Sequence, residues 1–549
     1  PASTLYGSEA VGGLINVIAK DPASSSLVSA DVSGTSWGEF NTDLGIRFRA
    51  GPKVTSLVGI NYFNFSETVD NNGDGFTDIA LQDRISIFNK WDLERPEGKL
   101  FSLALRYVYE DRWGGEMEWT RDDRGGDEVY GESIYTNRWE LIGNYDLPFS
   151  RDLRFQFSAN GHEQNSVYGD LDFEAEQYIG FGQLLWSHNI RRIHDLTAGA
   201  SVRYTYYDDN TPVTARGDGI VNEPSVIFLP GMFIQDEIST GLTTSLLAGI
   251  RYDYNSIHGS VLTPRINFKW RPVNRNMTWR LSVGNGYRVA NVFTEDHAAL
   301  TGARDVVFLS DLQPESSWNV NLNLVKSWYS AKNKIISSDF SVFYTHFSNR
   351  IVADYETDPQ KIIYDNLAGY AVSRGVSANM DITWTSGLST IFGFTLQEVY
   401  VVNDGLRDYQ LLTEPFSAIW SIRYKIGRSG LILDYTGNLY APMELPLLGD
   451  LDPRPSKSPW YSIQNIQISR QLRNGIRIYG GIKNLLDFTP PDYSIARAHD
   501  PFDKDVTFDQ NGDPIATANN PYALTFDPAY IYAPNQGRRF FLGIGLRIQ

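Results

Sequence analysis

The chain has 549 residues, of which 42% are hydrophobic and 13% aromatic, and its mean hydropathy is −0.30. No stretch approaches the roughly 18 uninterrupted apolar residues of a membrane-spanning helix, so helical membrane proteins are excluded. The lack of cysteine excludes disulfides and thiolate chemistry, and the net charge of −17 argues against a nucleic-acid partner, because phosphate binding depends on clustered Lys and Arg.

The chain opens with a glycine-containing motif. It begins at Pro1, with neither an initiator Met nor a signal segment, so we expect it to be part of a longer protein. Residues 6–20 read YGSEAVGGLINVIAK and precede the first predicted strand, residues 26–36. Localisation therefore has to be inferred from the body of the chain.

Long segments downstream alternate apolar and polar residues. Along residues 277–284, Met, Trp, Leu and Val alternate with Thr, Arg, Ser and Gly, and the pattern recurs at residues 44–49, 318–324 and 539–548. Because successive side chains of a strand point to opposite faces, this pattern predicts strands with one apolar face. Soluble sandwiches and propellers alternate too, but strands of about 10–15 residues are long for a globular sheet, where about 5 or 6 is typical.

Short and long connections alternate between these strands. The short ones are ten turns rich in Gly, Pro, Asn and charge: Pro52-Lys53, 94–98, 149–152, 190–193, Thr240-Gly241, 273–276, 331–334, Ser386-Gly387, 427–430 and Asn474-Gly475. Ten turns flanked by eleven longer loops imply about 22 strands, an even number within the range of outer-membrane barrels. Trp91, Trp186, Trp270, Trp328 and Trp384 lie near strand ends, as in an aromatic girdle.

We therefore predict an all-β fold, a transmembrane antiparallel β-barrel of about 22 strands. Long loops are expected near residues 69–80, 111–134, 208–224, 290–315, 402–415, 441–458 and 488–537. In such barrels the long loops face outward from the cell and the short turns face the periplasm. Function is therefore expected on the long loops and in the lumen below them.

Residues 70–78, DNNGDGFTD, match the first nine positions of a calcium-binding loop. The predicted ligands are Asp70, Asn72, Asp74, the carbonyl of Phe76, and Asp78. Position 12 is Leu81, so the usual bidentate Glu is missing. We expect a structural calcium ion here; the alternative is an ion-free turn, since Asp, Asn and Gly are common in turns. Residues 509–513 share the Asp and Asn spacing, but Pro514 follows, which predicts an ordinary turn.

The motif in residues 6–20 resembles the last segment of the plug domain of TonB-dependent outer-membrane receptors. Residues 483–487, KNLLD, resemble that family's penultimate-strand signature, and residues 312–315, LQPE, resemble its loop-to-strand motif. The resemblance covers essentially the whole chain. It implies that residues 1–24 are the C-terminal end, or remnant, of a lumenal plug and that residues 25–549 form a barrel in the outer membrane of a Gram-negative bacterium. The plug-motif residues it assigns are Tyr6, Gly7, Gly12, Gly13 and Asn16.

The resemblance also implies a function, the active uptake of a metal chelate, above all a ferric siderophore. Haem or cobalamin uptake is an alternative, and a plugless passive pore or a structural barrel of a surface complex is another. The implied partners are the TonB–ExbB–ExbD energising complex, acting on plug residues that would precede Pro1, outer-membrane lipid, the chelate and a surface lipoprotein. We find no phosphate-binding Gly-rich loop, His-Glu-x-x-His helix or nucleophile elbow, so we expect neither an enzyme nor a required cofactor.

The predicted substrate-binding residues follow the strand that carries Arg280 toward the lumen. They are Tyr287, Arg288, Phe293, His297 and Arg304. In haem receptors similar to this family, the corresponding loop supplies a histidine to iron, which would be His297; an ordinary surface histidine is the alternative. Lumen-facing Arg and Lys side chains could attract an anionic chelate or pair with acidic plug residues. Aromatic residues near the C-terminus could stack on a planar ligand or pack their own loop.

Overall fold

The structure is a computed structural model of the chain. It describes all residues except 1–3, 6, 10–12, 151, 216–220, 290–304, 311, 331–332, 355–356, 358–360, 404, 428 and 511. Within that part, no helix is long enough and apolar enough to cross a membrane. The helical segments found there are short 3-10 turns: Pro96–Gly98, Arg121–Asp123, Pro212–Thr214, Arg473–Gly475 and Asp492–Ser494.

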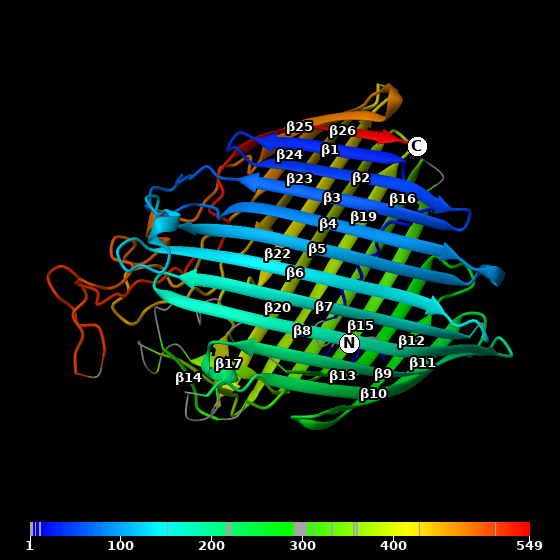
Figure 1. Cartoon of the computed structure of the whole chain (residues 1–549), viewed down its shortest axis with the longest axis horizontal. Coiled ribbons are helices and arrows are strands. Elements are labelled where there is room, and N and C mark those ends of the chain that lie inside the picture. The colour runs from blue at the N-terminus through cyan, green and yellow to red at the C-terminus, as the bar shows by residue number, and fades with distance from the viewer. Residues whose placement is uncertain are drawn as a thin grey trace.

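Twenty-two strands of the described chain form a ring. They are β1 (Val28–Thr35), β2 (Phe40–Gly51), β3 (Val54–Phe65), β4 (Leu81–Glu94), β5 (Leu100–Gly115), β6 (Gly131–Asp146), β7 (Leu153–Tyr168), β8 (Leu171–Ile190), β9 (His194–Asp209), β10 (Ser225–Ser239), β11 (Thr244–Asn255), β12 (Gly259–Trp270), β13 (Met277–Arg288), β15 (Glu315–Ser330), β16 (Lys334–Asn349), β19 (Tyr370–Trp384), β20 (Leu388–Asn403), β22 (Phe416–Ile426), β23 (Leu431–Tyr440), β24 (Gln464–Gln471), β25 (Ile476–Lys483) and β26 (Arg539–Ile548). Each is antiparallel to the next ring strand, and β1 pairs with β26, with Val28 opposite Ile548 (Figure 1). The sheet therefore closes on itself, which confirms the predicted barrel.

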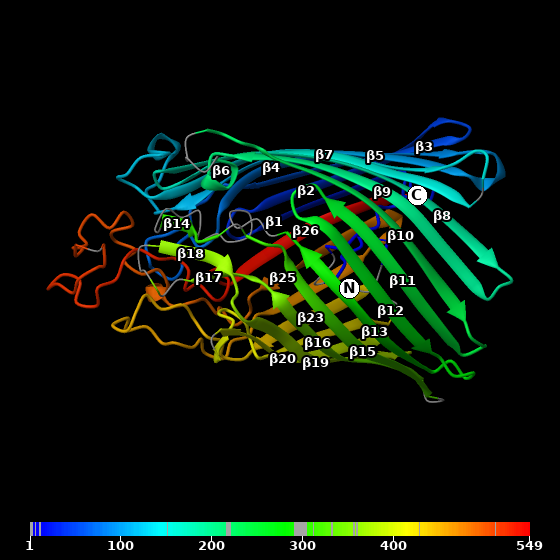
Figure 2. The ribbon, with the colours of Figure 1, turned by 90° about the horizontal axis from the view of Figure 1, so that it is seen from below.

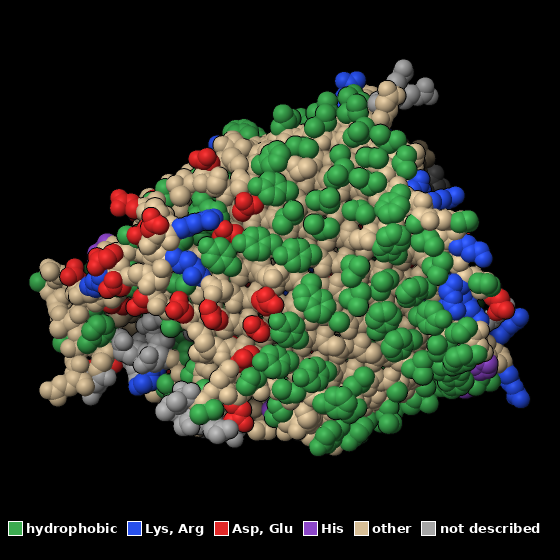
Figure 3. Space-filling model, in the orientation of Figure 1, with side chains coloured by type: hydrophobic (Ala, Val, Ile, Leu, Met, Phe, Trp, Pro, Cys, Tyr) green, Lys and Arg blue, Asp and Glu red, His purple; other side chains and the backbone are tan. Residues whose placement is uncertain are grey.

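The outer face of the barrel is apolar. Leu281, Val320 and Ile544 are 40%, 40% and 52% exposed, although the fold offers them no further layer to pack against. Figure 3 shows such side chains forming a broad band around the strands. An exposed apolar surface of this extent is unstable in water and suits hydrocarbon. The alternation predicted from the sequence is thus confirmed, with apolar side chains outside and their neighbours toward the lumen.

The two ends of the barrel differ. The ten predicted short turns join ring strands at one end, and the long loops gather at the other (Figures 1 and 2). Trp186, Trp270 and Trp328 lie exposed near the short-turn end, as a girdle requires. Lys and Arg side chains cluster at that end in Figure 3. By the usual orientation of such barrels, this end faces the periplasm.

The long-loop end is less uniform than the sequence predicts. β5 and β6 continue as a paired ladder to Gly115 and Gly131, inside the segment expected to be a loop. Three of the eleven connections are short, at residues 36–39, 169–170 and 256–258. The reason is physical: strands that rise above the membrane meet water on their outer face, so their sequences are polar like those of loops.

A small second sheet crosses the mouth of the barrel at the long-loop end (Figure 2). It contains β14 (Asp305–Phe308), β18 (Lys361–Asn366) and β17 (Ile351–Asp354), while β21 (Leu406–Tyr409) pairs antiparallel with the end of β20. Ile362 and Tyr364 of β18 are buried against the inner wall, in a cluster with Ile134, Tyr168, Phe173, Ala175 and Tyr207. The sequence analysis did not predict this inward-folded segment.

Candidate functional site

The N-terminal segment packs against the lumenal face of the barrel wall. The Arg203 guanidinium donates two hydrogen bonds to the Glu9 carboxylate, both at 2.6 Å. One N–H of Arg265 donates to the Gly7 carbonyl at 3.1 Å, and Arg265 itself is only 1% exposed. Both arginines are in phase with inward-facing residues of β9 and β12. Arg203, which the sequence analysis did not single out, thus pairs with an acidic residue of this segment.

A second buried pair supports the same segment. Arg251 and Asp253, 4% and 0% exposed, form a two-bond ion pair with both distances at 2.7 Å. The Arg251 guanidinium also donates to the Ser201 hydroxyl at 2.9 Å and reaches the Thr4 carbonyl at 3.5 Å. A charge buried this deeply is stable only with such a complete set of partners. The sequence analysis did not single out these residues, although the alternation of β11 places both in the lumen.

The plug-motif residues are only partly within the described chain. Gly7 and Gly13 have φ values of +92° and +129°, which side chains other than glycine rarely adopt, so glycine is required by the backbone at both positions. Asn16 lies in a stretch without regular secondary structure, in which Ile15 and Val17 are 91% and 86% exposed. Tyr6 and Gly12 lie outside the described residues. The division into a plug end and a barrel at residues 24 and 25 stays a prediction.

Two predicted substrate-binding residues, Tyr287 and Arg288, end β13 at the mouth. The Tyr287 main-chain N–H donates to the Ser8 carbonyl at 3.1 Å, which joins the strand end to the N-terminal segment. The Arg288 guanidinium donates to Glu315 at 2.8 Å. Phe293, His297 and Arg304 lie outside the described residues, so the structure neither brings them to this place nor separates them from it.

Arg350 adds a second cation to this corner of the mouth. Its guanidinium donates to the Gln410 side chain at 2.9 Å. Burial lowers the pKa of Arg350; the charge of Glu315 opposes that effect and the charge of Arg288 adds to it. Glu315 is only 4% exposed and also accepts the Ile351 main-chain N–H at 3.2 Å. Among the described residues, the buried Glu315 carboxylate thus bonds to Arg288 and acts through its charge on Arg350, so two guanidinium groups lie near one carboxylate at this corner.

The predicted calcium loop connects β3 to β4. Asp70 accepts the main-chain N–H groups of Gly73 and Gly75 at 2.7 and 3.0 Å, and Asp74 accepts that of Phe76 at 2.9 Å. Asp78 is 8% exposed, and burial raises its pKa to about 6, with the Asp70 and Asp74 charges adding to the effect of burial. Within the described chain, no three Asp, Glu, His or Cys side chains are grouped closely enough to hold a metal by themselves. Calcium here stays a prediction.

The connection between β25 and β26, residues 484–538, is hereafter the terminal loop. It covers the long-loop end through two buried clusters. In one, Phe526 stacks on Phe76 with ring centroids 5.9 Å apart and lies 4.9 Å from the Tyr130 ring. In the other, Tyr530 packs with Met443, Leu445, Tyr461 and Ala533. Of the two roles considered for these aromatic side chains, packing of the loop is the one the structure shows for Phe526 and Tyr530.

Beside the terminal loop lies a recess of about 640 Å³. It is bounded by Phe488, Tyr493 and Tyr532 of the terminal loop, by residues 455–459, and by Asn72 of the predicted calcium loop. Its walls are rich in proline and aromatic rings. Such a surface can hold a planar or aromatic group, and its place on the long-loop side makes it accessible from outside the cell.

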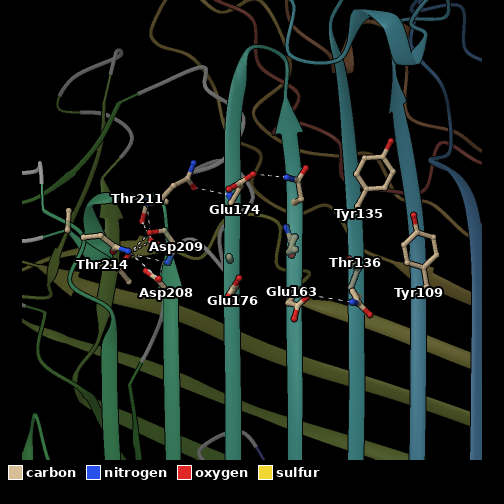
Figure 4. A pocket seen from close by; sticks show the side chains of 17 residues that line it. Tyr109, Tyr135, Thr136, Glu163, Glu174, Glu176, Asp208, Asp209, Thr211 and Thr214 are labelled. Carbon is tan, nitrogen blue, oxygen red and sulfur yellow. Dashed lines mark hydrogen bonds between the residues drawn. The ribbon is translucent and has the colours of Figure 1, made fainter.

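A polar recess of about 670 Å³ lies on the outer face of the barrel, on the long-loop side of the apolar band (Figure 4). Glu163, Glu176 and Asp208 stand opposite one another on β7, β8 and β9, and the Tyr178 and Tyr206 hydroxyls donate to Glu163 and Asp208 at 2.9 and 3.3 Å. No Lys, Arg or His is among the described lining residues. The recess suits cationic or hydroxyl-rich groups, and it faces away from the lumen. The sequence analysis missed it, although these carboxylates share the phase of the outward residues.

Comparisons with known proteins agree with this architecture. The family model "TonB dependent receptor-like, beta-barrel" matches residues 57–485. The siderophore receptor PirA from Pseudomonas aeruginosa superposes with a TM-score of 0.64 at 13% identity, covering 98% of this chain and 83% of that one. A mutant of the ferric enterobactin receptor PfeA from Pseudomonas aeruginosa, in complex with enterobactin, gives a TM-score of 0.69 at 12% identity with the same coverage. At such identities the likeness shows the fold alone.

A curated relative is similar in sequence. It is the iron-regulated outer membrane virulence protein of Vibrio cholerae, 22% identical in an alignment of 371 residues that covers 64% of this chain and 52% of the relative. The chain spans about half the length of the curated relatives it matches.

Proposed function

The chain belongs to the TonB-dependent receptors and is an outer-membrane β-barrel, and from that membership we propose that it serves the uptake of a ferric siderophore. Membership in a family of receptors, and not of enzymes, agrees with the lack of catalytic motifs in the sequence. The proposal therefore concerns binding and transport, with no covalent change to the ligand.

The observation that carries the proposal is a pair of arginines at one corner of the mouth. Among the described residues, the Arg288 and Arg350 guanidinium groups both lie near the buried Glu315 carboxylate, and such a pair of cations would attract an anionic ligand. Many ferric siderophores are anionic chelates. The names of the similar proteins support the same ligand class: two solved structures are a siderophore receptor and a ferric enterobactin receptor, and the curated relative is iron-regulated.

Transport needs an energy source, which we propose to be the TonB–ExbB–ExbD complex acting on the plug. The contacts of Glu9 and Gly7 with wall arginines support a plug end seated in the lumen, where a pull could be transmitted. The surface lipoprotein stays a prediction.

Ligand binding by the full-length protein in detergent micelles tests the proposal. The 13 tryptophans provide an intrinsic fluorescence signal. We expect saturable quenching by a ferric siderophore, with neither haem nor cobalamin competing for the site. Saturation by haem or cobalamin alone would show that the ligand belongs to one of those classes and is not a ferric siderophore. A large steady current in a planar bilayer, with no ligand binding, would show that the protein is a passive pore and not a receptor.

A further inference from the structure

The loop between β3 and β4 is wound around its own acidic side chains. Asp70 accepts two main-chain N–H groups of the loop and Asp74 accepts one. Gly73 and Gly75 have φ values of +79° and +87°, which let the chain turn tightly around the carboxylates. Within the described chain, no Lys, Arg or His forms an ion pair with Asp70, Asp74 or Asp78. The loop thus concentrates negative charge, and among the described residues no cationic side chain pairs with it.

The burial of Asp78 makes this concentration of negative charge unfavourable. Asp78 is only 8% exposed, and therefore 92% buried. One of its oxygens, Oδ2, accepts the Asn71 main-chain N–H at 2.7 Å. The other oxygen, Oδ1, is buried and has no hydrogen-bond partner among the described residues. An ionised carboxylate oxygen is stable in such a place only when it is paired. Because the nearby Asp70 and Asp74 charges act against its ionised form, a cation at Oδ1 would stabilise the Asp78 carboxylate.

The chemistry of the loop selects the kind of cation. All potential ligands are oxygens, spaced at alternate positions as in loops that hold calcium, with glycine at the sixth position. Since the carboxylates do not hold an ion by themselves, the Asn72 side-chain oxygen and the Phe76 carbonyl would complete the set. Calcium accepts such a flexible set of oxygens, whereas magnesium demands a stricter octahedron.

The same loop supports the terminal loop. Phe76, inside the acidic segment, stacks on Phe526 of the terminal loop. A Cβ added at Gly537 would lie 2.6 Å from the Asn71 side chain, so the terminal-loop backbone lies directly against the acidic segment. Asp492, also in the terminal loop, is close enough for its charge to act on Asp74. The repulsion within the segment therefore acts at the place where the terminal loop docks.

We propose that residues 70–78 bind a calcium ion and that the bound ion fixes the terminal loop to the loop between β3 and β4. The ion neutralises the repulsion among the carboxylates and holds Phe76 in the aromatic cluster. The position of the terminal loop at the long-loop end of the barrel thereby depends on extracellular calcium.

Calcium titration of the full-length protein in detergent micelles, after dialysis against a chelator, tests the binding. We expect one calcium per chain, with a dissociation constant of about 10⁻⁴–10⁻³ M, the range of extracellular calcium modules. Asp78→Asn should weaken binding at least about tenfold, because it removes the charge that the ion would compensate. Asp513→Asn, the same change in the terminal-loop turn, should leave binding unchanged. No calcium binding by the unmodified protein would overturn the site.

Hydrogen exchange of residues 484–538 tests whether the bound calcium fixes the terminal loop. Calcium should slow exchange in this segment in the unmodified protein and in Asp513→Asn, but not in Asp78→Asn. Exchange in the ring strands, far from the loop, should be the same in all three and shows that the variants are folded. Calcium binding without slower exchange of the terminal loop would contradict the coupling between the two loops.

Discussion

Both oxygens of the Glu9 carboxylate accept hydrogen bonds from the Arg203 guanidinium at 2.6 Å, which joins the N-terminal segment to the inside of the barrel across 194 residues of sequence. Charge-assisted pairs with this two-bond geometry are the strong ones. The pair is only partly shielded from water, so we expect a moderate contribution to the docking of the segment.

Arg203→Gln should release the N-terminal segment. The loss of a charged hydrogen-bonded contact of this kind costs about 1.5–3 kcal/mol, so hydrogen exchange of residues 4–9 should be at least about tenfold faster. Arg280→Gln is the matched control, because the partner of Arg280 among the described residues is Asn323 of the neighbouring strand. Equal protection of the segment in both variants would show that Arg203 does not hold it.

Closure of the barrel by β1 and β26 can be tested by a disulfide, since the chain has no cysteine. Ala30 is opposite Leu546, so Ala30→Cys combined with Leu546→Cys should cross-link. Ala30→Cys combined with Leu542→Cys should not, because Leu542 is opposite Gly34, about 13 Å farther along the strand. Mass spectrometry of the linked peptides distinguishes the two results, and cross-linking of the second pair alone would contradict the register.

Arg350→Gln should weaken the binding of an anionic ferric chelate. Removing one charged hydrogen-bond donor costs about 1.5–3 kcal/mol, which is roughly a tenfold to hundredfold loss of affinity. Arg374→Gln is the control. Arg374 lies opposite Tyr344 on the neighbouring strand, and Tyr344 is 43% exposed on the outer face. Because residues opposite each other share a face of the sheet, Arg374 points away from the lumen. If both variants bind the chelate equally well, the mouth arginines do not contribute to recognition.

The terminal loop should become more stable in mild acid. Burial raises the pKa of Asp503 to about 6, above its ordinary value of 3.8, although the Phe526 main-chain N–H and Arg497 favour the charged form. Ionised Asp503 therefore costs stability above pH 6, and this cost disappears as the pH falls below 6 toward 4. Asp503→Asn should slow hydrogen exchange of the terminal loop at about pH 7.5 and have little effect at about pH 4.5. The same effect at both pH values would rule out titration of Asp503 as the cause.

The ring strands could be predicted because alternation is a local property. Leu281 and its neighbours reveal their faces within one strand, and the turn residues mark where each strand ends. For the same reason the lumenal position of Arg203 follows from the exposed Val202 and Tyr204 beside it. What alternation could not supply is the partner, since Glu9 is joined to Arg203 only by the closed fold.

The mouth could not be predicted in the same way. Ile362 and Phe173 share a buried cluster only because β18 packs against the inner wall, and no pattern within β18 indicates the wall it meets. The spacing of residues 70–78 predicted a calcium loop, but the burial of Asp78 depends on the packing of the loops around it. Long-range packing, which has no local signature, decides both cases.

Uptake of radiolabelled iron by cells that produce the full-length protein tests the central claim most directly. We predict that iron supplied as a ferric siderophore enters these cells but not cells lacking the protein, and that uptake stops when TonB is removed. Uptake that continues without TonB, or equal uptake by cells with and without the protein for every ferric siderophore offered, would contradict the proposed function.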